Sequence, residues 1–507
     1  MKRWLYLVHR WFGIALCLVM ALWFLSGIVM LYVGYPKLTD EERWQGLPAL
    51  RAEGCCVPLA QALQAAGLAG GDGAAAAAMG WRLTSVAGEP TFIFNDGTKL
   101  AVAVGARSGE RVQGAGVLDA LRAARHFAGE ASAQYVGTVQ EDAWTHSRAI
   151  DAHRPLHRIA VDDAQSRWLY ISSHTGEVVR DATLTERRWG WIGAWLHWLY
   201  IFRGGALNPW WTDIVIGLAL AGGVLSIAGM AVGILRWRWC RPYRNGRRTP
   251  YGGFVARWHH WLGLGGGALA VTWVISGLLS MNPWKVFDSG GVKPDRLAYA
   301  GGSLQAAQAP EAAAALAQLR SHGVAVKELE WRRVGGTHVV LAHGAGITQV
   351  LDAQGLRDEG LPASLWQAAA RTLLPRARIV EAQQLADFDR YYVTREPHTM
   401  TGHRERPLPV WRLRFDDPNE TWVTIDPRTG GILQIIDGHR RVERWLFGFL
   451  HSFDLPLLLR SRPPWDIGMV GFSLAGLGLS LTGVVTGWRR LRRRSGSRMP
   501  YRGVRAT

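Results

Sequence analysis

Four stretches of the chain contain no Asp, Glu, Lys or Arg and consist almost wholly of apolar residues. Each is 22 to 25 residues long, and at about 1.5 Å of rise per residue each can cross a hydrocarbon layer of about 30 Å as one helix. The stretches are Trp11–Tyr35, Ile214–Leu235, Trp261–Trp284 and Ile467–Trp488. The pattern predicts an α-helical membrane protein with four transmembrane helices, and it excludes a soluble enzyme, a disordered chain and a fibrous protein.

The two long segments between these stretches have mixed hydrophobic patterns. Ala-rich runs at Leu59–Ala66, Ala115–Gly129 and Glu311–Leu319 favour helices. Alternating runs at Trp168–Ser172 and Trp422–Ile425 favour strands, because each leads into a Thr-Gly turn of the kind that closes a hairpin. Each long segment is therefore expected to fold as a small α+β domain.

The two halves of the chain repeat each other at a nearly constant offset of 250 to 254 residues. The matched positions include histidines, Ser-Gly pairs, Asp-Asp pairs and Thr-Gly turns. They are Trp11 with Trp261, Ser26 with Ser276, Asp162 with Asp416, Thr175 with Thr429, His197 with His451, Pro209 with Pro463 and Ser226 with Ser480. We therefore expect two tandem repeats, each made of a span, an outer α+β domain, a short amphipathic segment and a second span.

This interpretation divides the chain into eight parts. They are transmembrane helix 1 at 1–35, outer domain 1 at 36–188, an interfacial helix with transmembrane helix 2 at 189–240, a basic loop at 241–257, transmembrane helix 3 at 258–286, outer domain 2 at 287–441, an interfacial helix with transmembrane helix 4 at 442–489, and a basic tail at 490–507.

Charge predicts the orientation of these parts. The 507 residues carry a formal net charge of +18. The whole excess lies in three short segments without any acid, at 2–10, 236–257 and 489–507, and each of them flanks a span. Basic residues concentrate on the cytoplasmic flanks of membrane spans, so both termini and the middle loop are expected in the cytoplasm. Nucleic-acid binding also uses many arginines, but their place beside the spans argues against a nucleic-acid partner.

Two smaller features of the sequence bear on membrane insertion and on the possible cofactor sites. The first apolar stretch exceeds the usual length for a cleaved signal peptide and no A-x-A-like site follows it, so we interpret it as a signal anchor. The cysteines Cys17, Cys55, Cys56 and Cys240 form no CxxC or CxxCH motif, which excludes covalent c-type haem and thiolate zinc sites. Cys55 and Cys56 are interpreted as an incidental adjacent pair, with any role left open.

Histidines stand at both predicted membrane faces, where ionisable residues are functional candidates. His9 lies at the cytoplasmic end of the first span, and its repeat mate His259, with His260 beside it, lies at the same end of the third. His197 and His451 lie in aromatic segments just before the second and fourth spans, near the outer face. The faces are up to about 37 Å of helix apart, so the histidines are expected to form one pair per face.

Several roles compete for these histidines. An interfacial histidine can simply anchor a helix among lipid headgroups. A proton relay would need carboxylates along the spans, which have none, and zinc or hard-cation sites recruit Asp, Glu or Cys as further ligands. Two neutral imidazoles on facing helices, among aromatic and small residues, suit the axial positions of a b-type haem. The pattern therefore favours two haems b per chain, with the iron bound by His9 and His259 at one face and by His197 and His451 at the other.

The choice between His259 and His260 stays open at this point. The repeat alignment favours His259, because His260 falls where Arg10 stands in the first half. Further candidates rest on charge and position alone. Arg187, Arg188 and Arg444 are candidates for haem propionates, and His153, His157, Arg203 and Arg460 for an anionic or neutral substrate.

The repeated motifs resemble a known family. HRWFG and HHWLG, each followed by a span with Ser-Gly, then the turns TGEVV and TGGIL and the segments AWLH and GFLH, look like the PepSY-associated transmembrane family. The resemblance covers nearly the whole chain and is weakest at 36–112 and 288–361. It implies a bacterial inner-membrane protein with PepSY-like periplasmic domains, and its members include di-haem ferric-siderophore reductases.

The resemblance therefore implies a haem-dependent oxidoreductase that passes electrons across the membrane and reduces a ferric siderophore or other ferric chelate, releasing Fe(II) for uptake. No nucleotide-binding motif is present, so the electron donor is expected to be a quinol or a separate reductase. Membrane lipid is the other expected partner. A non-catalytic PepSY protein that binds or inhibits a periplasmic peptidase is the alternative. An iron transporter is a third possibility, but the spans lack the polar interruptions that build midplane substrate sites.

Overall fold

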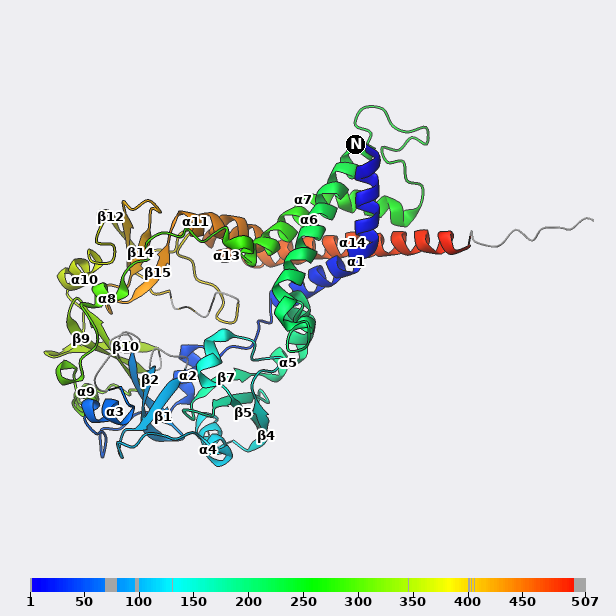
Figure 1. Cartoon of the computed structure of the whole chain (residues 1–507). Helices are drawn as coiled ribbons and strands as arrows, with labels where there is room; N and C mark the ends of the chain where they lie inside the picture. The colour runs from blue at the N-terminus through cyan, green and yellow to red at the C-terminus, as the bar shows by residue number, and fades with distance from the viewer. Residues whose placement is uncertain are drawn as a thin grey trace, which may run out of the picture.

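The computed structural model describes residues 2–68, 80–95, 100–129, 131–344, 346–399, 402, 404 and 406–496. It combines a bundle of long helices with β-sheet domains, so the fold class is α+β (Figure 1). Among the described residues, four helices are long and apolar enough to cross a membrane, as expected for a multi-pass membrane protein. They are α1 (Lys2–Met30), α6 (Trp211–Arg236), α7 (Phe254–Ser280) and α14 (Pro464–Gly496). The residues of the basic tail from 497 onward lie outside the described part.

The helices do not coincide with the uncharged stretches. α1 begins at Lys2 and includes Arg3 and Arg10, and it ends at Met30 rather than continuing to Tyr35. The length of an uncharged stretch reflects the thickness of the hydrocarbon layer. A helix, by contrast, continues for as long as its backbone groups are paired. Long basic side chains can extend along the helix to the polar interface, so they do not end it.

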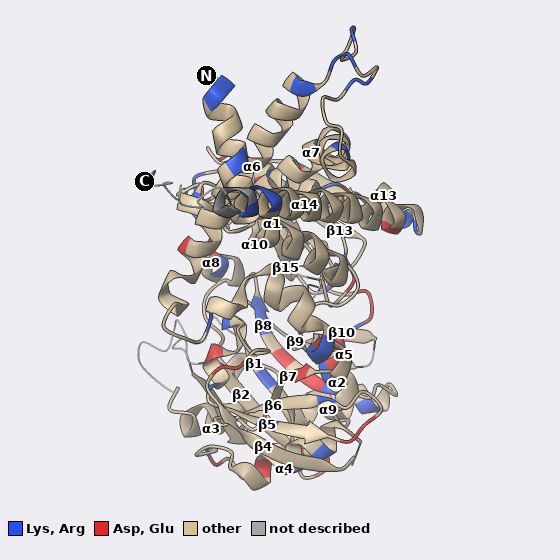
Figure 2. Cartoon of the chain, turned by 90° about the vertical axis from the view of Figure 1, so that its right-hand side faces the viewer, with Lys and Arg blue, Asp and Glu red and all other residues tan. Residues whose placement is uncertain are grey.

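The bundle has two helices from each half of the chain. α1 packs against α14 and α6, and α7 packs against the same two helices. The N-terminus, the loop from α6 to α7 and the C-terminal end of α14 lie at the end of the bundle away from the sheets (Figure 1). Lys and Arg gather at that end while the helix stems carry other residues (Figure 2).

The first outer segment alternates short helices with strands. Its elements are α2 (Asp40–Gly46), α3 (Leu59–Ala65), β1 (Trp81–Val86), β2 (Glu89–Asn95), β3 (Ala101–Gly105), α4 (Val117–Phe127), β4 (Ala133–Val139), η3 (Arg148–His153), β5 (Leu156–Val161), β6 (Trp168–Ser172), β7 (Val178–Ala182) and α5 (Leu184–Gly190). The π-helix η4 (Trp191–Trp195) and the 3-10 helices η5 (Tyr200–Phe202) and η6 (Asn208–Trp210) lead into α6. The expected helices at 59–66 and 115–129 correspond to α3 and α4, and the expected strand at 168–172 is β6.

The second outer segment has a closely similar order of elements. They are η7 (Pro283–Lys285), α8 (Arg296–Ala300), η8 (Ala306–Gln308), α9 (Ala312–Ser321), β8 (Glu328–Val334), β9 (Thr337–Gly344), β10 (Ile347–Asp352), β11 (Gly355–Arg357), α10 (Ala363–Ala370), β12 (Ile379–Leu385), β13 (Val410–Phe415), β14 (Trp422–Ile425), β15 (Ile432–Ile436), α11 (Gly438–Glu443), η9 (Arg444–Phe449), α12 (Leu450–Ser452) and α13 (Pro456–Arg460). The expected helix at 311–319 is α9 and the expected strand at 422–425 is β14.

The strands of the described part of the chain form three antiparallel sheets. β4 to β7 and β12 to β15 make matching four-stranded sheets, one in each half. The third sheet has seven strands in the order β11-β10-β9-β8-β1-β2-β3, because β1 pairs with β8. In this pairing Trp81 stands opposite Trp331, its mate at an offset of 250. The two outer segments, which the sequence presents as separate domains, are thus joined by one continuous sheet.

A buried network of ion pairs fixes this junction. Arg82 on β1 donates to Glu177 at 3.0 Å and to Glu328 on β8 at 2.9 Å, and Arg43 on α2 also pairs with Glu328. The side chain of Glu328 is only 2% exposed. Burial by itself would raise the pKa of Glu328, but Arg82 and Arg43 outweigh it and hold the pKa well below its usual range. Removing one partner would leave a buried charge unpaired, which typically costs about 3–5 kcal/mol.

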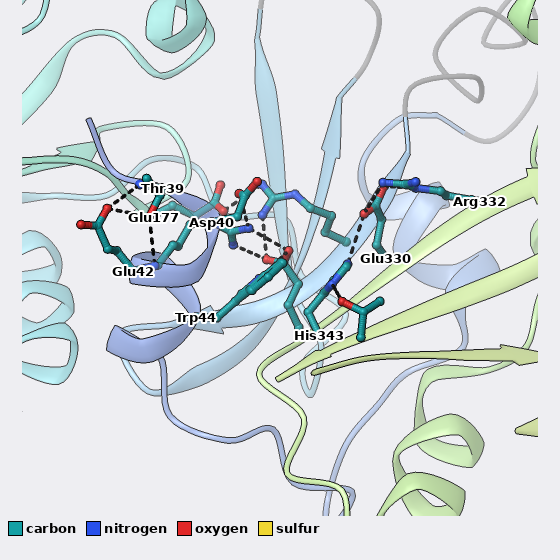
Figure 3. A network of polar contacts seen from close by, with 12 residues as sticks. Thr39, Asp40, Glu42, Trp44, Glu177, Glu330, Arg332 and His343 are labelled. Atoms are coloured by element: carbon teal, nitrogen blue, oxygen red, sulfur yellow. Dashed lines mark hydrogen bonds and ion pairs between the residues drawn. The ribbon is translucent and has the colours of Figure 1, made fainter. Parts of the chain in front are cut away.

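Stacked rings extend the same contact. Trp44 on α2 lies over His343 on β9, with ring centroids 4.4 Å apart and planes 9° from parallel (Figure 3). His343 in turn contacts Glu330, which pairs with Arg332 at 2.6 Å. Because α2 belongs to the first half and β8 and β9 to the second, these contacts hold the halves together outside the bundle.

A second bridge between the halves is centred on His398. Its Nε2 lies 2.7 Å from Glu42 at the start of α2, and its Nδ1 lies 3.2 Å from Glu186 on α5. Hydrogen bonds to Glu186 and Glu42 raise the pKa of His398 to about 10. Burial opposes ionisation of Glu42, but the bonds from His398 and Thr39 outweigh it and lower the pKa of Glu42 to about 2. The imidazolium therefore clamps the second half onto two helix starts of the first.

The replacement His398→Gln is expected to make stability less dependent on pH. The pKa of His398 is higher when folded, so its contribution is complete below its usual value of 6.5 and is lost as pH rises towards about 10. The side chain is 36% exposed, so we expect a loss of about 1 kcal/mol at a pH of about 6 after solvent screening. Thermal unfolding of the wild type and the variant in detergent, at a pH of about 6 and of about 10, measures this difference in stability. The exposed His439→Gln is the control, and a wild-type advantage that does not shrink with pH would contradict the bridge.

Candidate functional site

The structure brings the four matched histidines together as two pairs. His9 on α1 faces His259 on α7, and His197, just after η4, faces His451 on α12. The ring centroids are 6.1 Å apart in each pair. Each pair takes one imidazole from each half of the chain, so neither pair exists within a single repeat.

The outer pair is held by the repeated Ser-Gly dipeptides. Ser26 Oγ lies 3.0 Å from His197 Nδ1, and Ser276 Oγ lies 3.0 Å from His451 Nδ1. Each serine donates its own hydrogen to the carbonyl oxygen three residues earlier, so it must accept from the imidazole. Nδ1 therefore carries the proton, and the lone pair of each ring is on Nε2. Among the described residues no hydrogen bond engages Nε2 of either ring.

His259 of the inner pair is oriented in the same way. Its Nδ1 lies 3.2 Å from the carbonyl oxygen of Leu479 and 3.1 Å from Thr482 Oγ1. A carbonyl can only accept, and Thr482 already donates to the helix backbone. Nδ1 is again the protonated nitrogen and Nε2 carries the lone pair. In His9 the Nδ1 atom is buried and has no hydrogen-bond partner among the described residues.

A glycine lies beside each of the four rings. A Cβ on Gly229 of α6 would stand 2.9 Å from Cε1 of His9, closer than real side chains approach. A Cβ on Gly483, the mate of Gly229 on α14, would stand 3.5 Å from Cε1 of His259. At the outer pair Gly27 and Gly277 are the glycines of the Ser-Gly pairs and lie beside His197 and His451. Only His9 needs its glycine for space, because a Cβ at Gly483, Gly27 or Gly277 would make ordinary van der Waals contact with the ring.

His260 does not join either pair. Its Nε2 lies 2.9 Å from the carbonyl oxygen of Gly233 and its Nδ1 lies 2.8 Å from Thr249 Oγ1. Nε2 must donate to the carbonyl, so His260 has the opposite tautomer from His259 and no free lone pair. Tyr251 stacks edge-on against the ring at 5.3 Å. His260 therefore anchors the basic loop to the end of α7, and of the two adjacent histidines only His259 faces His9.

The spacing of the pairs fits a metal held between two imidazoles. Imidazoles that share one metal, each through a nitrogen about 2 Å from it, have ring centroids about 6 Å apart, and both pairs show 6.1 Å. No group of three or more His, Cys, Asp or Glu side chains among the described residues is placed to hold a metal ion. The donor set is thus two neutral nitrogens in an apolar surrounding, which suits the axial ligands of haem better than a metal cage.

The pairs lie closer together than the sequence suggests. His197 rests against Ser26 and Gly27 rather than beyond the end of α1. From His9 to Ser26 is about 25 Å along the helix, compared with the expected 37 Å. The outer pair is therefore enclosed by the bundle, because the segment after α5 folds back along α1 before α6 begins.

Most of the arginines and outer histidines suggested by position have other partners, whereas Arg188 is exposed and makes no ion pair within the described part of the chain. Arg444 pairs with Asp454 at 2.7 Å, and Arg187 donates to the carbonyl oxygens of Ala182 and Ser166. The remaining candidates differ in their surroundings. His157 bonds Thr138 and Ala115, His153 is half-buried near Glu177, Arg203 pairs with Glu141, and Arg460 lies 3.9 Å from Asp387. Cys55 and Cys56 are joined by a disulfide bond at the edge of a hydrophobic core.

Sequence reasoning singled out the Ser-Gly repeat but not its role. The supporting residues Ser26, Ser276 and Gly229 carry the signal of repetition alone, since nothing in the sequence says which histidine each contacts. No family model matches the chain, and no curated protein matches it. The geometry of the histidine pairs is therefore the main basis for assigning a function.

The replacement His260→Phe is expected to loosen the basic loop without disturbing the histidine pairs. Phe preserves the ring but leaves the Gly233 carbonyl and Thr249 hydroxyl without their partner, at a cost of about 1–3 kcal/mol. The loop 236–257 carries seven arginines, so the rate of trypsin cleavage within it reports the loosening. Faster cleavage in the variant is the expected result, and an unchanged rate would show that His260 does not anchor the loop.

Proposed function

We propose that this chain is a haem-dependent reductase of the bacterial inner membrane, with one b-type haem held by His9 and His259 and the other by His197 and His451. The observation that carries the proposal is the pair of histidine contacts, each at 6.1 Å and each built from both halves of the chain. The resemblance of the repeated motifs to the PepSY-associated transmembrane family supports the same function.

The chain's own residues prepare each imidazole for this role. Ser26 and Ser276 fix the tautomer of the outer rings, and the Leu479 carbonyl fixes that of His259. Hydrogen bonds to the second ring nitrogen orient a ligating histidine and raise its basicity. Bound haem supplies an iron that gains and loses one electron. Apolar helices around the pairs exclude water and thereby tune the potential at which that exchange occurs.

The substrate proposed is a ferric chelate, such as a ferric siderophore, on the periplasmic side. Oxygen donors of such chelates are hard ligands that suit Fe(III), whereas the softer Fe(II) is held far less tightly. One-electron reduction therefore releases the metal. The electron donor proposed is a quinol or a separate reductase, because the sequence contains no nucleotide-binding motif.

The proposed architecture is two tandem repeats with PepSY-like periplasmic domains and cytoplasmic termini. The matching order of elements in the two halves supports the repeats. The basic residues at the bundle end away from the sheets support the orientation, because they mark cytoplasmic flanks.

The four ligand histidines are expected to divide into two groups. His197→Ala and His451→Ala should each remove or convert the same haem, because each leaves one imidazole without its partner. His9→Ala and His259→Ala should do the same to the other haem. The measurement is haem per protein and the reduced-minus-oxidised spectrum of purified protein, together with reduction of an external ferric chelate, which loss of either pair should abolish.

His260→Ala is the matched control for His259→Ala, since it changes the adjacent histidine that already has two hydrogen-bond partners. It is expected to retain both haems. Colourless protein from haem-replete cells would overturn the reductase proposal and favour the peptidase-binding alternative. Two unchanged haems in His197→Ala and His451→Ala would overturn the outer ligand assignment.

The orientation has its own test. A reporter fused after Thr507 is expected to be active only in the cytoplasm, and one inserted at the exposed turn near Gly323, between α9 and β8, only in the periplasm. The expectation follows from the placement of the basic flanks. The opposite activities would reverse the topology and the proposed direction of electron flow.

A further inference from the structure

A groove of about 330 Å³ lies between the sheet β4 to β7 and the start of η4. Its volume falls within the range of small-molecule sites, roughly 300–1,000 Å³. Three tryptophans and three arginines dominate its lining: Trp144, Trp168, Trp191, Arg158, Arg187 and Arg188. We call it the arginine–tryptophan groove. Trp191 stands six residues before His197 in the chain, and the segment between them kinks at Gly193.

The arginines of the groove are only partly neutralised. Asp142 is the one acid among the lining residues, and it pairs with Arg158 at 3.1 Å. Arg187 donates only to carbonyl oxygens, which carry no formal charge. Arg188 is exposed and makes no ion pair within the described part of the chain. Burial and the nearby charges of Arg158 and Arg188 lower the pKa of Arg187, as expected where positive charge is in excess.

The second half of the chain contains the same arrangement, but there acidic residues neutralise the arginines. At an offset of 254, Arg158, Trp168 and Arg187 correspond to Arg412, Trp422 and Arg441. In both halves the guanidinium groups lie over the tryptophan, at 4.6 and 4.2 Å from Trp168 and at 5.0 and 4.4 Å from Trp422. The cation–π contacts are therefore common structural features and do not explain the excess charge of the first half.

The two halves differ in what meets these arginines. Arg412 makes a two-bond pair with Asp389, at 2.6 and 3.0 Å, and Arg441 pairs with Glu420 at 2.8 Å. Val442 stands where the first half has Arg188. Acids therefore neutralise the second site, whereas the first keeps its positive charge.

An aromatic side chain also covers the second site. Tyr391 lies against Trp422 at 5.2 Å, and its hydroxyl accepts a hydrogen bond from Trp445, the mate of Trp191. In the first half the corresponding tryptophans Trp168 and Trp191 line a groove with measurable volume. The first half thus has an open, positively charged aromatic site, whereas side chains cover the equivalent site of the second half.

We propose that the arginine–tryptophan groove binds one arm of an anionic ferric chelate with aromatic oxygen donors, such as a ferric tricatecholate. Trp144 and Trp191, which meet edge to face at 5.1 Å, offer aromatic surface to the arm, and the guanidinium groups of Arg187 and Arg188 pair with its oxygen donors. The groove holds one arm rather than a whole complex, so the iron stands at its mouth. The proposal rests on the proposed function only for the fate of the iron, because binding of the complex needs no reduction.

The test uses a complex that cannot be reduced. Gallium(III) has the charge and nearly the size of ferric iron but no accessible lower state, so its tricatecholate complex reports binding alone. Calorimetric titration of the full, haem-loaded chain in phosphatidylcholine nanodiscs should show binding that weakens with salt. The neutral gallium(III) trihydroxamate complex should bind more weakly.

Arg188→Gln should weaken binding of the tricatecholate complex by about two- to fivefold, the range for an exposed charge contact. Arg414→Gln is the matched control, because Arg414 also lies over the equivalent tryptophan, at 5.4 Å, but in the neutralised site. It should leave the affinity unchanged. Equal affinity for the two gallium complexes, or for wild type and Arg188→Gln, would overturn the proposal.

Two other occupants have distinct outcomes. Loss of haem from Arg188→Gln would assign the arginines to the outer haem, and loss of binding in phosphatidylglycerol nanodiscs would assign the groove to anionic lipid. Either result overturns the proposal. Binding of the gallium complex without any reduction of its ferric counterpart would leave the groove intact and refute the reductase function. Reduction of the ferric complex, together with unchanged binding by Arg188→Gln, would support the reductase function and refute the groove as the binding site.

Discussion

Each histidine pair takes one imidazole from each half of the chain, and this requirement governs the rest of the architecture. His9 meets His259 and His197 meets His451 only if the helices of the two repeats pack in one bundle. The supports come instead from within a repeat, since Ser26 holds His197 and Ser276 holds His451. A single repeat can thus orient its imidazoles but cannot complete a two-imidazole site.

Contacts outside the bundle hold the halves in the register that the pairs need. The pairing of β1 with β8 makes one sheet of the two outer segments, with Trp81 opposite its mate Trp331. The buried pairs of Arg82 with Glu177 and Glu328 make this junction costly to open, because separation would expose apolar surface and leave charges unpaired. The outer domains therefore restrain the relative position of the two helix pairs as well as offering a surface.

The halves are nearly equivalent where they meet and different where they face outward. Ser-Gly pairs and the glycines beside the rings match position by position around the histidines. Around Trp168 and Trp422 the same stacked arginines persist, but only the second half neutralises them with Asp389 and Glu420. The two sites can be compared directly because both contain the cation–π contacts. Their difference is therefore the positive charge that remains unneutralised in the first half.

The sequence by itself determined the four long helices, the repeat, the main hairpins and the identity of the matched histidines, because hydrophobic length, offset and alternation are local or periodic signals. It did not determine the choice between His259 and His260. Adjacent residues point to different sides of a helix, and only the packing of α7 shows that His259 faces His9 while His260 meets Gly233 and Thr249. The junction of β1 with β8 and the charge left in the arginine–tryptophan groove were likewise decided by tertiary structure, because both depend on which distant side chains meet.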